Sequence, residues 1–293
     1  MVLCMKTRIE RVGLFGKYGD KGGREVLERL CALLQKRNLH IVVDADTAAA
    51  LNIHHVPTAP IERIGTEIDL AIVMGGDGTL LNVARTLAVH RIPLIGINIG
   101  RLGFLADVST DNMDMIGGIL DGHYQTEQRF LLTAEIVRSG QTVLTRLAFN
   151  DVVVNKGELA RLIEFETYID GQFVSGSRAD GIIVATPTGS TAYAMSAGGP
   201  ILHPELAALV LVPICPHTLS NRPIAVPSHS HVEIVLVSDQ SAHATFDGQS
   251  SFRLVNGDRV RVRRADVPVT LIHPLDRNHY EVLRQKLNWG RRL

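Results

Sequence analysis

The chain has 293 residues, of which 45% are hydrophobic, so it can bury a sizeable core and is long enough for two domains. Its 30 Lys and Arg residues balance 30 Asp and Glu residues, which argues against a nucleic acid or an anionic membrane surface as partner. The three widely spaced cysteines fit neither a disulfide framework nor a zinc site, and the 12 histidines show no metal-ligand spacing. With no signal peptide and no run of roughly 20 apolar residues, we expect a cytoplasmic protein without a membrane segment.

Short apolar runs alternate with helical periodicity from residue 9 to about residue 122, which is typical of βαβ units on a parallel sheet. The pattern predicts strands at 8–15, 39–43, 69–74 and 94–98, and a helix at 24–37. The strand at 69–74 is apolar almost throughout, as expected for a strand that is covered on both faces. Thr79 is expected to cap a helix that extends to about His90.

After about residue 122 the period changes from helical to two, with alternation at 132–136, 163–169 and 232–236. Tight-turn signals separate these runs at Ser139-Gly140, Asp170-Gly171, Asp247-Gly248 and Asn256-Gly257. The second half is therefore predicted to be a β domain. Helical spacing returns only at 278–287, and this last segment is expected to pack back on the first domain.

The loop Gly75-Gly76-Asp77-Gly78-Thr79 follows the buried strand and precedes a helix. Such a turn presents backbone N–H groups and the positive end of a helix dipole at one point, which favours an anion such as phosphate. A carboxylate at its centre is useful if it binds Mg²⁺ or accepts a proton from an attacking hydroxyl, so the loop suggests phosphoryl transfer. The alternative is a tight turn in which Asp77 only bonds local N–H groups. Lys17, Lys21 and Arg24 lie either near a donor phosphate or on a solvated basic loop.

Hydroxyl and small residues gather between Arg178 and Pro200, around the run Thr186–Tyr193. Such a segment offers hydrogen bonds to the edge of a base, with Tyr193 available to stack, although a surface loop joining two strands has the same composition. Asn150-Asp151 is either a turn signal or a pair that binds the hydroxyls of a ribose.

Together these segments resemble the motifs of the NAD kinase family, in the same order along the chain. The matching segments are Gly75–Thr79 (GGDGT), Asn98–Leu105 (NxGxLGFL), Asn150-Asp151 (Asn-Glu or Asn-Asp) and Asp180–Pro200 (DG-x4-TPTGSTAY-x4-GGP). The resemblance implies phosphorylation of the 2′-hydroxyl of the adenosine ribose of NAD, with ATP as donor and Mg²⁺ or another divalent cation as cofactor. Asp151 departs from the more frequent Glu by one methylene, and Arg178 is similar to members that prefer ATP to polyphosphate.

The resemblance also implies a role for each matching residue. Asp77 would be the catalytic carboxylate, and Gly75, Gly76, Gly78 and Thr79 would face the donor phosphates. The residues implied in NAD binding are Asp77, Gly78, Phe104, Asn150, Asp151, Arg178, Asp180, Thr191, Ala192, Tyr193, Ser196 and Gln249. Among them Asn150 and Asp151 would bind the adenosine portion, Thr191, Ala192 and Tyr193 the adenine, and Asp180 the nicotinamide end.

The resulting fold class is α/β plus β. A Rossmann-like parallel-sheet domain spans residues 1–122 together with 275–293, and an all-β NAD-binding domain spans 123–274. The site is expected between them, and members of the family are homodimers or homotetramers. Two other functions stay open: a lipid or sugar kinase with a similar Gly-Gly-Asp-Gly loop, and a non-catalytic NAD sensor.

Overall fold

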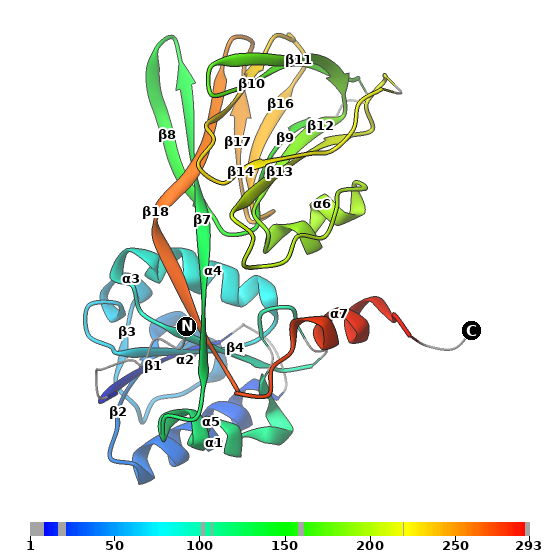
Figure 1. Cartoon of the computed structure of the whole chain (residues 1–293). Helices are drawn as coiled ribbons and strands as arrows, with labels where there is room; N and C mark the ends of the chain where they lie inside the picture. The colour runs from blue at the N-terminus through cyan, green and yellow to red at the C-terminus, as the bar shows by residue number, and fades with distance from the viewer. Residues whose placement is uncertain are drawn as a thin grey trace. The chain divides into compact units, whose positions relative to one another are not determined.

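The computed structural model describes residues 9–16, 22–100, 103–106, 108–157, 161–218 and 220–290 (Figure 1). The chain divides into two compact units. Unit 1 comprises 1–128 and 269–293, and unit 2 comprises 129–268. The chain leaves unit 1 within strand β7 (Gln125–Arg138) and returns within strand β18 (Arg259–His273), so unit 2 is an insertion in the sequence of unit 1.

Unit 1 is built around a parallel sheet with the strand order β5-β4-β1-β2-β3. These strands are β1 (Arg11–Gly16), β2 (His40–Asp44), β3 (Thr58–Ala59), β4 (Leu70–Met74) and β5 (Leu94–Asn98). The short β6 (Val108–Ser109) and the end of β18 both pair in parallel with β5. The residues of β4 and β5 are buried throughout, as an apolar run on both faces requires.

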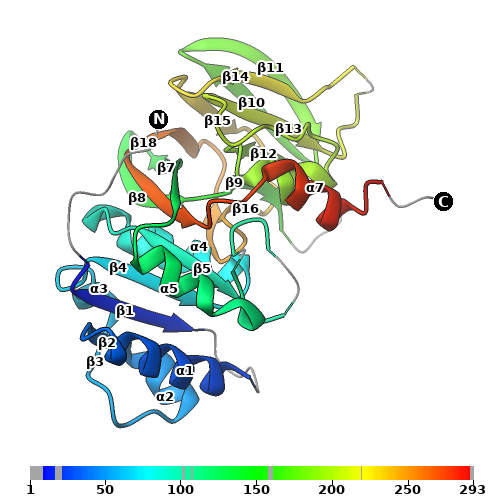
Figure 2. The ribbon, with the colours of Figure 1, turned by 60° about the horizontal axis from the view of Figure 1, so that its bottom comes forward.

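Helices cover both faces of this sheet. Helices α1 (Gly23–Lys36) and α5 (Asp114–Leu120) lie on one face and α3 (Ile61–Ile64) and α4 (Asp77–Leu87) on the other, as Figures 1 and 2 show. The remaining helical segments are α2 (Ala45–Leu51), the 3-10 turns η1 (Ala88–His90) and η2 (Thr110–Asn112), and α7 (His279–Leu287). The core that α1 and α5 form with the sheet includes Ile272, which lies in β18, after the chain has returned from unit 2 to unit 1. The predicted parallel-sheet domain is confirmed, with α7 belonging to it.

Unit 2 is an antiparallel sandwich, which confirms the β domain predicted from its period-two pattern. One sheet has the order β14-β13-β12-β9-β16-β17, and the other contains β11, β10, β15 and β18 together with β7 and β8. The bounds are β8 (Gln141–Ala148), β9 (Asp151–Lys156), β10 (Ile163–Ile169), β11 (Gln172–Ala179), β12 (Gly181–Ala185), β13 (Ala208–Ile214), β14 (Ile224–Pro227), β15 (Val232–Leu236), β16 (Ala242–Phe246) and β17 (Ser250–Leu254). Their inward residues, such as Phe165 and Phe246, form one buried core.

The outer face of the first sheet is covered by a segment with little regular structure. This segment contains the 3-10 turn η3 (Gly189–Thr191) and the single-turn helix α6 (Tyr193–Ser196). Ala194 and Leu202 from it pack on the outward side chains of β9, β12 and β13, including Val153, Ile183 and Val212. The hydroxyl-rich segment is therefore anchored to the sheet through its apolar residues.

Candidate functional site

The loop 75–79 joins the buried strand β4 to helix α4. Gly75 has a φ of +149°, which residues with side chains rarely adopt, and a Cβ there would lie 2.7 Å from Thr79 Oγ1. The helix begins at Asp77 with Gly76 as its N-cap residue, so the expected cap at Thr79 is wrong. Thr79 is already the third helical residue, and its side chain lies over Gly75. Gly76 and Gly78 are exposed, which leaves the start of α4 open to an anion.

The Asp77 carboxylate is fixed by three consecutive peptide groups of another segment. Its Oδ2 accepts a hydrogen bond from Phe104 N at 2.8 Å, and its Oδ1 accepts bonds from Leu105 N and Ala106 N at 3.0 and 3.2 Å. A Cβ at Gly103 would collide with the same carboxylate. The bonded N–H groups thus come from the segment that follows β5 and not from the turn of Asp77. Two of the motifs found in the sequence are joined at this carboxylate.

A second layer of polar contacts lies behind Phe104. Arg277, whose side chain is 9% exposed, donates from Nη2 to the carbonyl oxygen of Phe104 at 3.1 Å and from Nη1 to the Glu127 carboxylate at 3.0 Å. The Nε2 atom of the buried His273 lies 3.3 Å from the same carboxylate. Lys286 of α7 lies over the Phe104 ring, 5.5 Å from its centroid. The C-terminal segment therefore braces the peptide that orients Asp77.

In unit 2, Asn150 and Asp151 stand at the start of β9, between β12 and β16. Thr186 donates from its backbone N to the carbonyl oxygen of Asn150 at 2.9 Å and from Oγ1 to that of Phe149 at 2.7 Å. On the N–H side, the peptide groups of 149–151 donate to the Asp247 carboxylate. Asn150 and Asp151 are thus held by hydrogen bonds at the start of a strand and do not form an isolated turn.

Asp151 is buried, with 4% of its surface exposed. Burial, and secondly the negative charge of Asp247, raise the pKa of the Asp151 carboxyl to about 7. Near neutral pH a large fraction of this carboxyl therefore keeps its proton and can donate a hydrogen bond.

Several hydroxyls of the segment 186–196 form hydrogen bonds within the protein. Thr186 and Ser190 are fully buried, and Ser190 Oγ donates to Pro187 O at 2.6 Å and accepts from Leu202 N at 2.9 Å. The buried Arg129 donates to Thr188 Oγ1 at 2.9 Å. Thr191 Oγ1 bonds the carbonyl oxygen of Thr188 at 3.1 Å. In this segment Tyr193, at 45%, and Ser196 are exposed, whereas Thr191, Ala192 and Met195 are half-buried.

Asp180 and Arg178 flank the junction of β11 and β12. Asp180 forms an ion pair with Lys156 of β9, with 2.6 Å between Oδ1 and Nζ. The Arg178 side chain is 63% exposed, and its Nε lies 3.7 Å from Oε1 of Glu164 on the neighbouring strand β10. Gln249 is exposed in the turn between β16 and β17.

Within each unit the structure brings part of the predicted set together. In unit 1 these are Gly75–Thr79 and Phe104, and in unit 2 they are Asn150, Asp151 and the segment 186–191. Arg101, Leu102, Lys17 and Lys21 lie outside the described residues, and Arg24 pairs with Glu28 at 2.9 Å. Sequence reasoning missed Asp247, Lys156 and Arg277; the only signal was Asp247-Gly248, which was interpreted as a turn alone.

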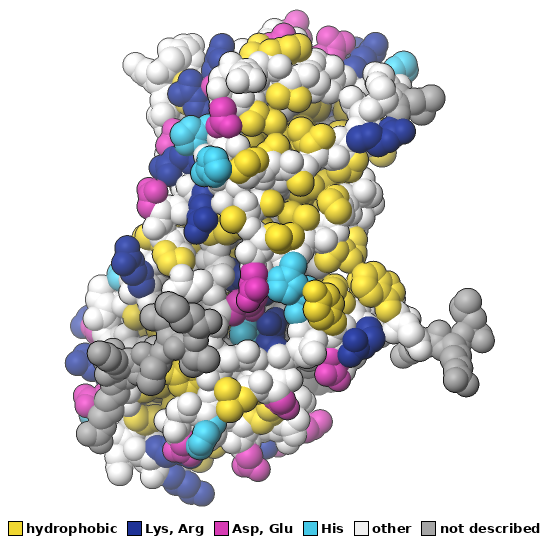
Figure 3. Space-filling model, viewed as in Figure 1, with side chains coloured by type: hydrophobic (Ala, Val, Ile, Leu, Met, Phe, Trp, Pro, Cys, Tyr) yellow, Lys and Arg dark blue, Asp and Glu magenta, His cyan; other side chains and the backbone are white. Residues whose placement is uncertain are grey.

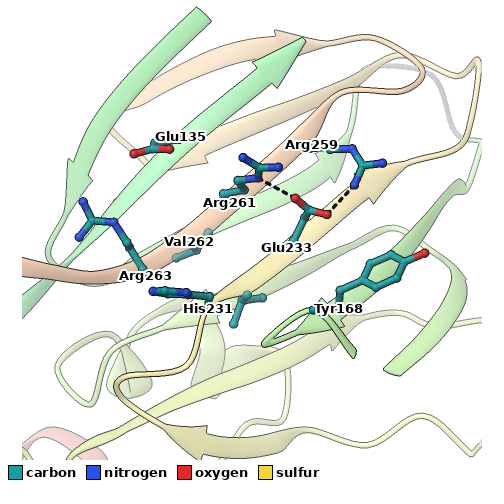
Figure 4. A pocket seen from close by; sticks show the side chains of 10 residues that line it. Glu135, Tyr168, His231, Glu233, Arg259, Arg261, Val262 and Arg263 are labelled. Carbon is teal, nitrogen blue, oxygen red and sulfur yellow. Dashed lines mark hydrogen bonds and ion pairs between the residues drawn. The ribbon is translucent and has the colours of Figure 1, made fainter. Parts of the chain in front are cut away.

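A cavity of about 460 Å³ in unit 2 lies against β7, β10, β15 and β18 (Figure 4). Its described lining includes none of the predicted site residues. Arg259 Nη1 donates to Glu233 Oε1 at 2.6 Å, and Arg261 Nε donates to Glu233 Oε2 at 2.7 Å, so these three charged side chains are paired with one another. Among the described residues, no three His, Cys, Asp or Glu side chains converge on a metal-sized space, and no helix is long and apolar enough to cross a membrane.

Two models of known families match the chain. The one described as ATP-NAD kinase N-terminal domain matches residues 12–125, and the one described as ATP-NAD kinase C-terminal domain matches residues 149–274. Over 290 residues the chain is 49% identical to the NAD kinase of Thiobacillus denitrificans, covering 99% of this chain and 100% of the relative. Over 287 residues it is 50% identical to the NAD kinase of Nitrosospira multiformis, covering 98% of each.

Two crystal structures share the fold. The structure of yeast NADH kinase complexed with NADH is 24% identical with a TM-score of 0.90, covering 98% of this chain and 90% of that one. The structure of an NAD kinase from Archaeoglobus fulgidus in complex with ATP is 26% identical with a TM-score of 0.74, covering 94% of this chain and 99% of that one.

Proposed function

This chain belongs to the NAD kinase family of phosphotransferases, and from that membership we propose that it transfers the γ-phosphoryl group of ATP to the 2′-hydroxyl of the adenosine ribose of NAD, giving NADP and ADP. The observation that supports this reaction most directly is the Asp77 carboxylate at the first residue of α4, oriented by three peptide N–H groups.

Asp77 is the catalytic residue of the proposal. Its carboxylate orients the 2′-hydroxyl of NAD and accepts the hydroxyl proton late, because phosphoryl transfer passes through a loose transition state in which little base catalysis is needed early. Positioning then supplies most of the rate enhancement. The bonds from residues 104–106 support this role, since they fix the direction of the carboxylate before substrate arrives.

The donor phosphates of ATP are placed at the start of α4, against Gly75, Gly76, Gly78 and Thr79. The exposed Gly76 and Gly78 let phosphate oxygens approach the backbone, and the dipole of this 11-residue helix favours the negative charge. Mg²⁺ commonly keeps several waters and binds through one or two carboxylates plus substrate phosphates, so the single carboxylate of Asp77 fits a cation that arrives with ATP. Such a cation supplies neutralisation of the phosphate charge.

Unit 2 supplies most of the residues proposed to bind NAD. Asn150 and Asp151 bind the adenosine portion, and the raised pKa of Asp151 suits a carboxyl that donates a hydrogen bond to a ribose oxygen. The half-buried Thr191 and Ala192 and the exposed Tyr193 bind the adenine. Asp180, already paired with Lys156, is placed at the nicotinamide end. Arg178, Ser196 and Gln249 of unit 2 and Asp77, Gly78 and Phe104 of unit 1 complete the proposed set.

We also propose that the chain forms a homodimer or homotetramer. The strands β11 and β14 each end the strand order of their sheet and carry the exposed apolar residues Phe173, Val174 and Ile224. A cavity of about 240 Å³ is lined by residues of both strands. Figure 3 shows hydrophobic side chains gathered on the face of unit 2 that carries β13 and β14. An exposed apolar face beside open sheet edges is a favourable surface for a second copy.

The test of the reaction is formation of NADP by the purified protein with NAD, ATP and Mg²⁺, read with an NADP-specific dehydrogenase. Asp77→Asn is expected to lower kcat by at least about 100-fold, because the proton acceptor is lost, while NAD affinity stays within about tenfold, because the residues of unit 2 proposed to bind NAD are unchanged.

Asp114→Asn is the matched control, since Asp114 is also the first residue of a helix in unit 1. It is expected to keep wild-type turnover. NAD binding without ATP-dependent NADP formation would favour the non-catalytic sensor, and absence of NAD binding would favour a lipid or sugar kinase.

A further inference from the structure

Asp247 makes the same kind of contact in unit 2 as Asp77 makes in unit 1. Its carboxylate accepts hydrogen bonds from Phe149 N at 2.9 Å to each oxygen, from Asn150 N at 2.7 Å and from Asp151 N at 3.2 Å. Its own backbone N donates to the Asp151 carbonyl at 3.0 Å. Three consecutive peptide groups nearly a hundred positions earlier in the chain are thus bound by one side chain.

The position of Asp247 explains how it reaches them. It is the first residue of the tight turn between β16 and β17, with a φ of +52° and Gly248 next at +63°. Phe246 pairs with Val152 at the end of β16, so the turn lies directly beside the start of β9. The two positive φ angles are those of a hairpin turn that favours Asp-Gly, and the carboxylate of its first residue points along the neighbouring strand end.

The opposite side of the same peptides is also fixed. Thr186 binds the carbonyl oxygens of Phe149 and Asn150, and a Cβ at Gly189 would collide with the carbonyl of Asn150. The peptide of Asn150 is therefore bound on its N–H side by Asp247 and on its carbonyl side by the segment 186–189. Because the backbone at the start of β9 is bound on both sides, the directions in which the side chains of Asn150 and Asp151 leave it are fixed.

We propose that Asp247 is a positioning residue for NAD binding: its carboxylate fixes the Asn150 peptide and so sets the direction of the Asn150 and Asp151 side chains toward the adenosine ribose. This inference rests on the proposed function, which places those two side chains against NAD. An ionised carboxylate suits the task because it only accepts hydrogen bonds, and bonds to a charged acceptor are roughly twice as strong as neutral ones. The amide of an Asn would direct its own NH₂ group at a peptide N–H.

The test compares Asp247→Asn with wild type in steady-state kinetics. We expect KM for NAD to rise by at least about tenfold, with KM for ATP unchanged and kcat within about threefold, since only the residues proposed to hold NAD lose their support. A purely structural loss would lower the active fraction, and hence kcat, without raising KM for NAD alone.

Asp170→Asn is the matched control. Asp170 begins the Asp-Gly turn between β10 and β11 with a φ of +51°, and its Oδ1 accepts from His231 N at 2.8 Å. It thus shares the turn, the sign of φ and the contact with a backbone N–H, but it supports no residue proposed to bind NAD. Its variant is expected to have wild-type KM for both substrates.

A double-mutant cycle with Asn150→Ala tests whether Asp247 acts through Asn150. If it does, Asp247→Asn adds less than about threefold to KM for NAD in the Asn150→Ala background. Additive effects, or a KM for NAD within twofold of wild type in Asp247→Asn, would overturn the proposal.

Should Asp247→Asn fail to fold, Asp247→Glu keeps the charge but displaces the carboxylate by one methylene and is expected to raise KM for NAD about threefold or more; an unchanged KM would again overturn the proposal. NADP formation by the wild-type protein decides the proposed function separately. An active wild type with unaffected variants removes only the role of Asp247, whereas an inactive wild type removes both.

Discussion

At the scale of the residue, Asp151 shows how burial sets the charge of a site group. Its pKa is raised to about 7, so the folded chain keeps a proton that the unfolded chain loses near pH 4. Folding therefore takes up a proton between these values, and the free energy of unfolding falls as pH rises through that window. At 1.36 kcal/mol per pKa unit the full effect is on the order of 4 kcal/mol.

The prediction for Asp151 is that Asp151→Asn, which cannot ionise, removes this pH dependence. The free energy of unfolding of the wild type relative to the variant is expected to fall by about 3 kcal/mol between pH 5 and pH 8, measured by denaturant titration at several pH values. A difference that stays constant with pH would show that Asp151 ionises normally in the folded protein.

Asp77 and Asp247 share a feature that residue types alone do not reveal. Each is one carboxylate that accepts hydrogen bonds from three consecutive peptide N–H groups of a distant segment. Asp77 binds the segment 104–106, which contains Phe104, and Asp247 binds the segment 149–151 at the start of β9, which contains Asn150. In both units an aspartate connects two motifs that are far apart in sequence.

At the scale of the element, the return of the chain from β18 to α7 braces the segment that orients Asp77. Arg277 lies in this return, where it binds Glu127 and the Phe104 carbonyl, while Gln125 Nε2 donates to Pro274 O at 2.9 Å and to Arg277 O at 3.2 Å. The last elements of the chain thus complete the first unit and are not a dispensable tail.

Arg277→Ala should lower the free energy of unfolding by about 3 kcal/mol, because it leaves the half-buried Glu127 without its guanidinium partner. It should also lower kcat several-fold, because the Phe104 peptide loses its support. Thermal unfolding and NADP formation measure the two effects.

Arg284→Ala provides the control on the same segment, since Arg284 is an exposed residue of α7. It is expected to stay within about 0.5 kcal/mol of wild type. Equal behaviour of the two variants would contradict a bracing role for Arg277.

At the scale of the whole molecule, the two units differ in how continuous they are in sequence. Among the described residues, the buried members of the two sandwich clusters lie between 132 and 262, inside unit 2. The core of unit 1 includes Ile272, and Leu271 pairs with Leu94 of the parallel sheet. The described core of unit 2 therefore comes from one stretch of the chain, whereas that of unit 1 combines two stretches that unit 2 separates in sequence.

We expect the fragment 129–268 to unfold cooperatively on heating, followed by circular dichroism, because its sandwich core is complete. Residues 1–128 alone should not fold, whereas 1–128 joined to 269–293 through a short Gly-Ser linker should. A cooperative transition in 1–128 alone would show that the returning segment is not required.

Local pattern was enough to predict the fold class and most elements. The apolar run before Gly75 predicts a strand buried on both faces and is β4, and the Asp-Gly dipeptides at 170 and 247 predict hairpin turns that the positive φ angles confirm. The cap expected at Thr79 was wrong, because residue type cannot show that the helix begins two residues earlier at Asp77.

The sequence was sufficient for the fold class, the main strands of the parallel sheet, the loop that presents Asp77 and the resemblance to the NAD kinase family, since each depends on residues that lie close together within one segment. The tertiary structure alone shows which groups bind Asp77 and Asp247, that Lys156 pairs with Asp180, and that the Thr186 hydroxyl donates to the carbonyl oxygen of Phe149. These contacts join segments whose separation along the chain carries no periodic signal. They form because folding buries polar groups that must then find a partner.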